Sequence, residues 1–185
     1  MFKKGNSKIN NNTLIFCLPT HVCYGEGKQC KGCYALKSEQ RFPAVLASRK
    51  RNFEACLRSD FVGNAVKEIK KAALPYFRIH ESGDFFAQTY VNSWTQIIAA
   101  CPEVKFYTYT KKAEVLNLSP LTSQSNFNLV NGSNFINYGD EAFCNDLVEN
   151  KGYVLCPCRK GDKEKICMAS CFACTTEKRV CFIKH

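Results

Sequence analysis

The sequence predicts an α/β protein in which parallel strands form a partial, open barrel. Helical segments of about 10 to 15 residues alternate with short, nearly continuous apolar runs, and this alternation is typical of βαβ units with right-handed crossovers. The chain has 185 residues, whereas a closed barrel of eight strand–helix units needs about 250. We expect about six of the strand candidates to form, which suits a partial barrel.

Strands are expected where β-branched and aromatic residues are bounded by Pro, Gly or Asn. These runs are Thr13–Leu18, Tyr76–His80, Val104–Tyr109, Phe127–Val130, Phe135–Tyr138, Tyr153–Cys156 and Val180–Ile183. Helices are expected where apolar residues recur at helical spacing. These segments are Phe42–Leu57, Phe61–Leu74, Gln88–Cys101 and Asp140–Val148. The composition of residues 117–134 is typical of a loop.

The length suits one domain with a full core. Within it we expect two parts: residues 1–150 form the barrel and carry a cysteine loop, and residues 151–185 form a cysteine-rich segment packed on the same domain. No apolar run reaches the length of about 18 residues that a membrane span requires. We therefore expect no contact with a membrane.

Thirteen cysteines are unusual for a chain of this length. A disulfide scaffold is typical of small secreted proteins, but residues 1–8 are basic and lack the apolar region of a secretory signal. The odd count also prevents complete internal pairing. We therefore expect a cytoplasmic protein whose cysteines are reduced and partly bound to metal.

The formal net charge is +10, from 26 Lys and Arg against 16 Asp and Glu. A basic surface suits an anionic partner such as nucleic acid, a nucleotide or an acidic protein. The alternative is that the charge only serves solubility. In that interpretation Arg49–Arg51 and Lys70–Lys71 are ordinary solvated helix faces.

Residues whose side chains could bind a ligand or take part in a reaction follow the ends of the expected strands. They are the cysteine loop after the first strand, Ser82–Asp84 after the second, Lys111–Lys112 after the third, Asn131, Cys156, and Lys184–His185 after the last. In a parallel α/β sheet all these ends share one edge, where active sites form. The order of the sequence therefore predicts a single site.

The cysteine loop contains Cys23, Cys30 and Cys33, with six residues in the first gap and two in the second. Three thiolates can hold a metal centre and leave one coordination position open, which a catalytic centre needs. Zinc is one interpretation, because His21 or Cys17 could complete a closed set of four ligands. An iron–sulfur cluster with an exchangeable fourth position fits equally well.

A second set contains Cys156, Cys158, Cys167, Cys171 and Cys174 within 19 residues. Four of these cysteines make a closed metal site, with Cys167, Cys171 and Cys174 as ligands. The fourth ligand is Cys156 or Cys158, and Cys156 is favoured. Such a centre is most simply structural, and electron relay is the alternative.

The turn Ser82–Asp84 offers a close backbone approach at Gly83 and a carboxylate beside it. This arrangement can bind an ammonium group or ribose hydroxyls. The alternative is a helix N-cap, for which Ser and Asp are common. After the third strand, Tyr109 or Thr110 could reach the same site, and Lys111 could meet a carboxylate or phosphate.

Together these segments resemble the gene product 88 family of phages and mobile elements. The resemblance rests on Cys30–Ala35, Arg78–Phe86, Phe106–Lys111 and the C-terminal Cys156–His185, and it covers nearly the whole chain. That family looks like a reduced relative of radical S-adenosylmethionine (SAM) enzymes, whose shared core is a partial (β/α)6 barrel.

The resemblance implies that Cys23, Cys30 and Cys33 bind a [4Fe–4S] cluster, whose fourth iron takes the amino and carboxylate groups of SAM. Tyr34 resembles the aromatic residue beside the last cysteine of such loops, and Ser82–Asp84 stand where these enzymes bind the SAM ammonium group. Their usual loop spacing is Cys-x3-Cys-x2-Cys, so the longer first gap is a departure.

Two functions are therefore expected. The first is a radical-SAM-like iron–sulfur protein with two [4Fe–4S] clusters, an electron donor, and an unknown, possibly anionic substrate, in the host cytoplasm if a phage encodes it. The second is a non-enzymatic, basic nucleic-acid-binding protein that zinc or clusters stabilise.

Overall fold

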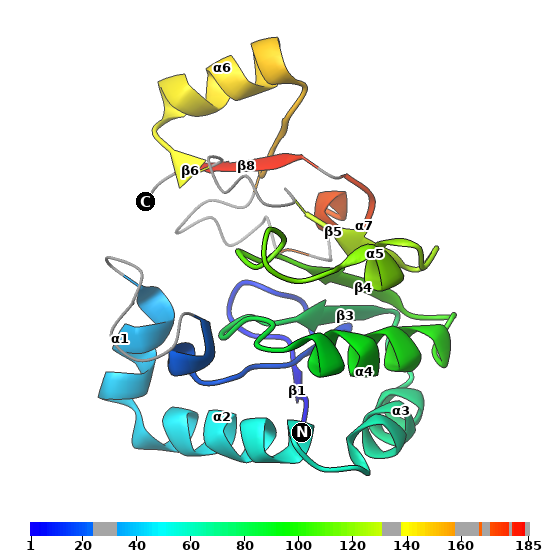
Figure 1. The fold of residues 1–185 in the computed structure, drawn as a ribbon. Helices are drawn as coiled ribbons and strands as arrows, with labels where there is room; N and C mark the ends of the chain where they lie inside the picture. Colours follow the sequence, from blue (N-terminus) through cyan, green and yellow to red (C-terminus); the bar gives the residue numbers. More distant parts are fainter. Residues whose placement is uncertain (24–32, 131–137, 158–166, 168–170, 178, 184–185) are drawn as a thin grey trace.

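A computed structural model describes residues 1–23, 33–130, 138–157, 167, 171–177 and 179–183 (Figure 1). Among these residues the strands form two sheets. The larger sheet has the order β1-β2-β3-β4-β5. Its strands are β1 (Lys3–Lys4), β2 (Thr13–Ile15), β3 (Tyr76–Ile79), β4 (Lys105–Thr108) and β5 (Phe127–Leu129). Strands β2 to β5 run parallel, and β1 pairs antiparallel with β2.

Helices connect the parallel strands of the larger sheet. They are the short 3-10 helix η1 (Thr20–Cys23), α1 (Tyr34–Arg41), α2 (Pro43–Cys56), α3 (Phe61–Ala72), α4 (Gln88–Ala99) and α5 (Ser119–Thr122). The four helices from η1 to α3 all lie between β2 and β3, so this crossover carries the cysteine loop and the helices that hold it.

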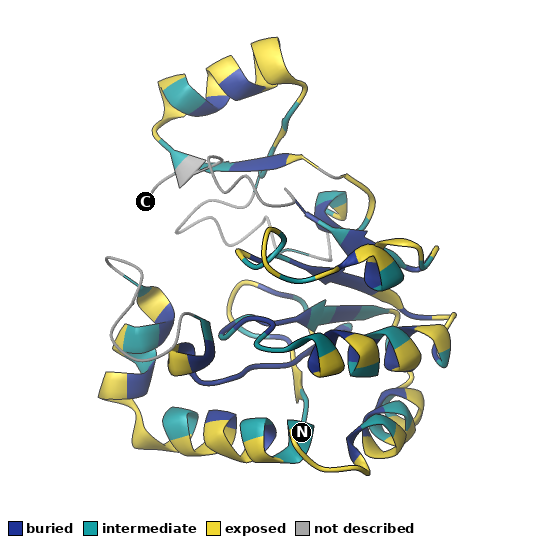
Figure 2. Ribbon diagram, in the orientation of Figure 1, coloured by how far each residue is buried: buried dark blue, intermediate teal, exposed yellow. Residues whose placement is uncertain are grey.

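The two faces of the larger sheet have different coverings. On β3, Phe77 and Ile79 belong to the main hydrophobic core with Ile69 of α3 and Trp94 of α4. Side chains alternate along a strand, so Arg78 faces the other side. Its register neighbour on β4 is Tyr107, which packs against residues of the C-terminal segment. Figure 2 shows the core as a buried band between the helices and the sheet.

The smaller sheet is formed by the C-terminal part of the chain. Its strands are β6 (Tyr138–Gly139), β7 (Val154–Leu155) and β8 (Val180–Ile183), in the parallel order β6-β8-β7. Helix α6 (Glu141–Lys151) starts at Asp140, whose carboxylate accepts a hydrogen bond from the Phe143 amide, and ends at Gly152 in the left-handed region. The short helix α7 (Ala173–Thr176) contacts β4 and β5. The smaller sheet therefore lies on the β5 side of the larger one (Figure 1).

Most expected elements form, with shorter strands. The expected helix Phe42–Leu57 is α2, but Leu57 at its end is 64% exposed and does not join the core. The region expected to be a loop contains α5 and β5, and the structure adds β1, which the sequence pattern did not predict. Among the described residues no strand pair joins the two sheets, and the partial barrel of six strand–helix units stays a prediction.

None of the helices in the described part of the chain is long and apolar enough to cross a membrane.

Candidate functional site

A cavity of about 280 Å³ lies at the carboxyl ends of β3 and β4. The cysteine loop contributes Cys23, Cys33 and Tyr34 to its wall, the segment after β3 contributes Ser82–Asp84, and the segment after β4 contributes Lys111. The structure thus brings together, at one edge of the sheet, three segments that lie far apart in the sequence. Their binding roles stay predictions.

Several other expected site residues are either outside the described residues or packed in the core. Cys30, Cys158 and Asn131, together with Lys184–His185, lie outside the described residues. Cys17 is buried and Cys56 packs against the main core, as a small apolar residue does.

The turn at Gly83 is built against the end of the β2 segment. The Leu18 amide donates to the Ser82 carbonyl at 2.8 Å, and the Ser82 hydroxyl donates to the Leu18 carbonyl at 2.9 Å. Gly83 has φ +81°, and a Cβ at this position would overlap with the Leu18 side chain. The position therefore requires glycine for both its conformation and its space.

Asp84 joins the ends of β3 and β4. Its carboxylate accepts hydrogen bonds from the Thr110 hydroxyl at 2.6 Å, the Lys111 amide at 2.9 Å and the Phe85 amide at 2.8 Å. Burial raises its pKa above the ordinary value, although these hydrogen bonds work in the opposite direction. The alternative of a helix N-cap is wrong, because α4 starts four residues later, after Ala87.

A buried ion pair holds both sides of the cysteine loop. The Arg49 guanidinium of α2 lies 2.9 Å from the Glu39 carboxylate of α1 and also donates to the Ala35 carbonyl at 3.0 Å. Glu39 accepts hydrogen bonds from the amide and the hydroxyl of Thr20, at 2.9 and 2.6 Å. Thr20 precedes Cys23, and Ala35 follows Cys33. The interpretation of Arg49 as a solvated helix residue is therefore wrong.

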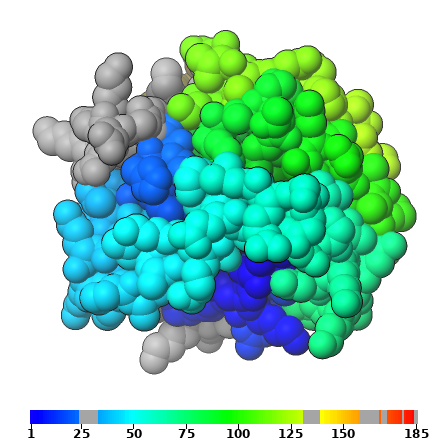
Figure 3. All heavy atoms as spheres, turned by 60° about the horizontal axis from the view of Figure 1, so that its bottom comes forward, coloured from blue at the N-terminus to red at the C-terminus, as the bar shows by residue number. Residues whose placement is uncertain are grey.

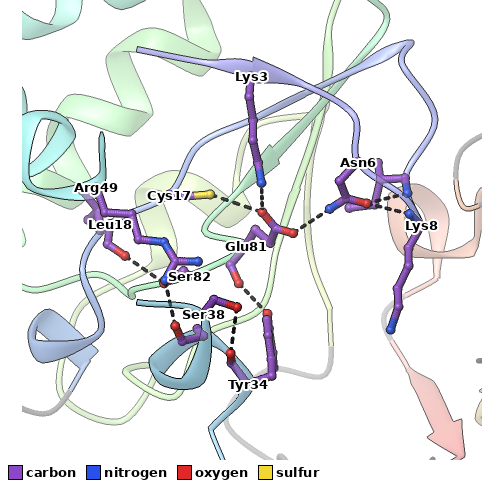
Figure 4. A network of polar contacts seen from close by, with 12 residues as sticks. Lys3, Asn6, Lys8, Cys17, Leu18, Tyr34, Ser38, Arg49, Glu81 and Ser82 are labelled. Carbon is purple, nitrogen blue, oxygen red and sulfur yellow. Dashed lines mark hydrogen bonds and ion pairs between the residues drawn. The ribbon is translucent and has the colours of Figure 1, made fainter. Parts of the chain in front are cut away.

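A second polar network lies behind the cavity, around Glu81 (Figure 4). The Glu81 carboxylate pairs with Lys3, accepts a hydrogen bond from the Asn6 amide group at 2.6 Å and one from the Cys17 thiol at 3.3 Å. The Tyr34 hydroxyl donates to the Glu81 backbone carbonyl at 2.5 Å. Burial opposes ionisation of Glu81, but Lys3 and Arg78 outweigh it and lower the pKa of this carboxyl.

Cys17, which donates a hydrogen bond to Glu81 in this network, stays protonated at neutral pH. Burial and the nearby Glu81 carboxylate raise its pKa to about 11. A neutral thiol is a poor metal ligand. The pKa thus favours the interpretation of Cys17 as a packing residue.

His80 lies beside the cavity, but its ring lies in the core. The ring packs against Phe16, Phe85 and Tyr90, and its Nε2 is 2.9 Å from the Tyr90 hydroxyl. Burial lowers the pKa of His80 to about 3, so the ring is neutral at neutral pH. Its backbone has φ +63°, an uncommon conformation for a residue with a side chain.

Arg78 of β3 and Tyr109, which follows β4, line the cavity. Tyr109 was one of the residues expected to reach this site, whereas no binding role was predicted for Arg78. The Arg78 guanidinium lies over the Tyr109 ring, with Cζ 5.3 Å from the ring centre. Phe182 of β8 packs against the same ring at 5.8 Å. An arginine in the middle of an apolar strand is the signal that could have identified this residue.

Three of the described C-terminal cysteines lie against the sheet face opposite the helices. Cys156, Cys167 and Cys174 pack in one cluster with Tyr107 and Tyr109. The Tyr109 hydroxyl is 2.7 Å from the Cys174 sulfur, so one side chain contacts both the cavity and the second cysteine set.

The backbones of Cys167 and Cys171 form an isolated parallel β-bridge. Within the described part of the chain, no three His, Cys, Asp or Glu side chains form a group that could hold a metal ion. The finding covers the expected set Cys156, Cys167, Cys171 and Cys174, because all four are described. It does not extend to a group that includes Cys30 or Cys158, which lie outside that part.

A basic groove lies on another face, between α2 and α3, with a volume of about 590 Å³. The charged side chains that line it are Arg51, Arg58, Lys67 and Lys71 together with Glu54 and Glu68, so basic residues outnumber acidic ones. Figure 3 shows this face, with the two helices side by side across its centre.

The fold and the cavity define a mixed α/β protein with a parallel sheet and a cysteine-lined pocket at its strand ends. Residues 1–131 match the gene product 88 family, and the chain belongs to this family. No solved structure was found to match it.

Two curated relatives are similar to the chain. They are the gene 88 proteins of Mycobacterium phages L5 and D29, and each is 35% identical over a stretch that covers 47% of this chain and 44% of the relative. The chain therefore aligns with less than half of the length of these relatives.

The donor chemistry of the cavity fits a cluster bound by thiolates. Cys23 and Cys33 both reach its wall, and the arginine and lysine there offset the negative charge of thiolates. The neighbouring turn at Gly83 also lines the cavity.

Proposed function

We propose that this chain is a radical-SAM-like iron–sulfur protein that binds SAM in the strand-end cavity, in the cytoplasm of the host cell. Cys23, Cys30 and Cys33 would hold a [4Fe–4S] cluster. The observation that carries the proposal is the cavity itself, whose lining includes Cys23, Cys33 and the Ser82–Asp84 turn.

The residues of the chain would bind and orient the ligand. A carboxylate has about four acceptor positions, and three at Asp84 are occupied by hydrogen bonds from the protein. The fourth would accept a hydrogen bond from the SAM ammonium group. Ser82 and Gly83 would fix the turn that positions Asp84, and Tyr34 and Lys111 would close the cavity on its exposed side.

When bound, a reduced cluster of this kind supplies one electron for the cleavage of SAM to methionine and a 5′-deoxyadenosyl radical. The protein would exclude water, position an unknown and possibly anionic substrate, and receive electrons from a separate donor.

The second cysteine set would hold an auxiliary centre with a structural role. Cys156, Cys167, Cys171 and Cys174 are the proposed ligands. The described structure does not group three of them as metal ligands, so metal binding would have to draw them together. Cys156, Cys167 and Cys174 already pack beside Tyr107 and Tyr109. A second [4Fe–4S] cluster is proposed, with zinc as the alternative.

The test is anaerobic purification and reconstitution, followed by iron, sulfide and zinc analysis, a visible spectrum, and an assay for 5′-deoxyadenosine with dithionite and SAM. We expect iron, sulfide and a reductant-dependent product, which Cys33→Ser abolishes. The matched control is Cys56→Ser on α2, which should keep the product. A reduced cluster that binds no SAM would contradict the proposal.

The basic groove between α2 and α3 favours a second candidate function, nucleic-acid binding. Phosphate contacts by Lys and Arg make binding fall steeply with salt. If this is the function, Lys67→Ala with Lys71→Ala should weaken the binding of single- or double-stranded DNA and reduce the salt dependence. Cys33→Ser should then leave DNA affinity unchanged in protein that remains folded.

A further inference from the structure

We propose that Arg78 anchors an oxyanion, a carboxylate or a phosphate, on the ligand that occupies the strand-end cavity. The inference rests on the proposed function only for the identity of that ligand as SAM. The anion site itself follows from the arrangement of Arg78 and its neighbours.

The first observation is that the cationic side chain of Arg78 forms no ion pair with a described carboxylate, although its charge helps to lower the pKa of Glu81. The Arg78 Nε is buried and has no hydrogen-bond partner among the described residues. A guanidinium has five N–H donors, and leaving the buried Nε–H donor unpaired costs free energy. A ligand that supplies acceptors would remove this cost.

The second observation is that the nearby carboxylates are occupied by other partners. Glu81 is held by Lys3 and Asn6, and Asp84 by Thr110 and two backbone amides. By contrast, the buried Arg49 has its own carboxylate partner, Glu39. Arg49, beside the cysteine loop, thus has a carboxylate partner. Arg78, in the cavity, forms no ion pair among the described residues, and its donors are left for a ligand.

The third observation is that Arg78 is already positioned. Its guanidinium lies over the Tyr109 ring, 5.3 Å from the ring centre, and Phe182 packs against that ring. Cation–π contact holds the planar group by its face and leaves its N–H edge for a planar, bidentate partner. Carboxylate and phosphate can accept two parallel hydrogen bonds from this edge. A lysine ammonium lacks the planar pair of donors that such binding requires.

The test compares ligands that differ in the anion. We would measure the binding of SAM, decarboxylated SAM and inorganic phosphate to the anaerobically reconstituted protein by calorimetry. The variants are Arg78→Met and Arg78→Lys. The lysine variant keeps the positive charge but loses the planar pair of donors of the guanidinium. Lys105→Met is the matched control, because Lys105 is an exposed cation on the neighbouring strand. Circular dichroism confirms that each variant is folded.

We expect Arg78→Met to weaken SAM binding by about 10- to 100-fold, in line with hydrogen bonds to charged groups. Arg78→Lys should have a smaller effect, and decarboxylated SAM should bind the wild type and Arg78→Met equally. If SAM does not bind the wild type but phosphate does, and Arg78→Met weakens phosphate binding, the SAM proposal fails and the anion site stands.

Three results would overturn the anion site. One is equal weakening of SAM and decarboxylated SAM in Arg78→Met, which would indicate a structural role. Another is unchanged binding of both SAM and phosphate in the folded Arg78 variants. The last is a wild-type protein that binds neither SAM nor phosphate.

Discussion

The two cysteine regions of this molecule differ in what surrounds them. Cys23 and Cys33 stand on the wall of a cavity, and the backbone on either side of them is held by the buried Glu39–Arg49 pair. In the C-terminal set, Cys156 and Cys174 instead pack with Tyr107 and Tyr109, on the face of the larger sheet opposite the helices.

Under the function that we propose, the two regions have different roles. A reactive centre needs space for a ligand and rigid support around it, and the first region has both. A structural centre needs to be closed and packed, which suits the second. The two regions meet at Tyr109, which lines the cavity and contacts Cys174.

The largest expected effect is loss of the support for the first region. Arg49→Met leaves the Glu39 carboxylate buried without its partner, which should lower the free energy of unfolding by about 3 to 5 kcal/mol. Urea denaturation followed by circular dichroism measures this change. Arg58→Ala is the control, because the Arg58–Asp60 pair is exposed, and no measurable change is expected. Equal effects in the two variants would mean that the buried pair does not support the loop.

The turn beneath the cavity is the next most sensitive position. Gly83→Ala introduces a Cβ that overlaps with Leu18 in a left-handed conformation, and we expect a loss of about 1 to 3 kcal/mol. The control is Gly63→Ala in α3, where nothing lies within 4 Å of the added Cβ. That variant should be stabilised by up to about 1 kcal/mol. Chemical denaturation of both proteins checks the contrast, and a tolerated Gly83→Ala would refute the tight turn.

The pH dependence of stability tests the buried histidine behind the first region. The folded state keeps His80 neutral, with a pKa of about 3, whereas the unfolded state binds a proton near pH 6.5, so acidification favours unfolding. Stability should fall by about 1.4 kcal/mol per pH unit below pH 6.5 and be fully present above it.

His80→Asn should remove this slope, since Asn tolerates the left-handed backbone and does not titrate. Tyr90 stays neutral, because burial raises its pKa well above the ordinary value. Denaturation between pH 7.5 and pH 5 measures both slopes. The same slope in wild type and variant would exclude His80 as its source.

The smallest expected effect concerns the contact between the regions. Tyr109→Phe removes the hydroxyl beside the Cys174 sulfur and should cost about 1 kcal/mol. Tyr76→Phe is the control, because Tyr76 packs against Phe172 through its ring and should keep its stability. Thermal unfolding distinguishes the two variants. A silent Tyr109→Phe would mean that the two regions are not coupled through this contact.

Local patterns were sufficient to predict the main elements of the larger sheet. Helical periodicity identified α3 and α4, and the apolar runs identified β3 and β4, because these signals lie within a few neighbouring residues. The convergence of Cys33, Ser82–Asp84 and Lys111 was predictable as well, since parallel strands place their carboxyl ends at one edge.

Pairings between distant charged residues were not predictable. Glu39 and Arg49 have the appearance of solvated helix residues, and only the packing of α1 on α2 buries them together. The sequence also could not show that Arg78 forms no ion pair among the described residues, because this depends on the partners that Glu81 and Asp84 take in the fold. Strand β1 has two lysines and no apolar pattern, so its pairing with β2 had no sequence signal.

The most direct test of the central claim is the electron paramagnetic resonance spectrum of the reduced, anaerobically reconstituted protein with and without SAM. An open centre in the strand-end cavity predicts a [4Fe–4S] signal that changes when SAM is added. Cys33→Ser should lose this response, whereas Cys56→Ser should keep it. A cluster spectrum that is identical with and without SAM, or a colourless protein that contains zinc in place of iron, would contradict the claim.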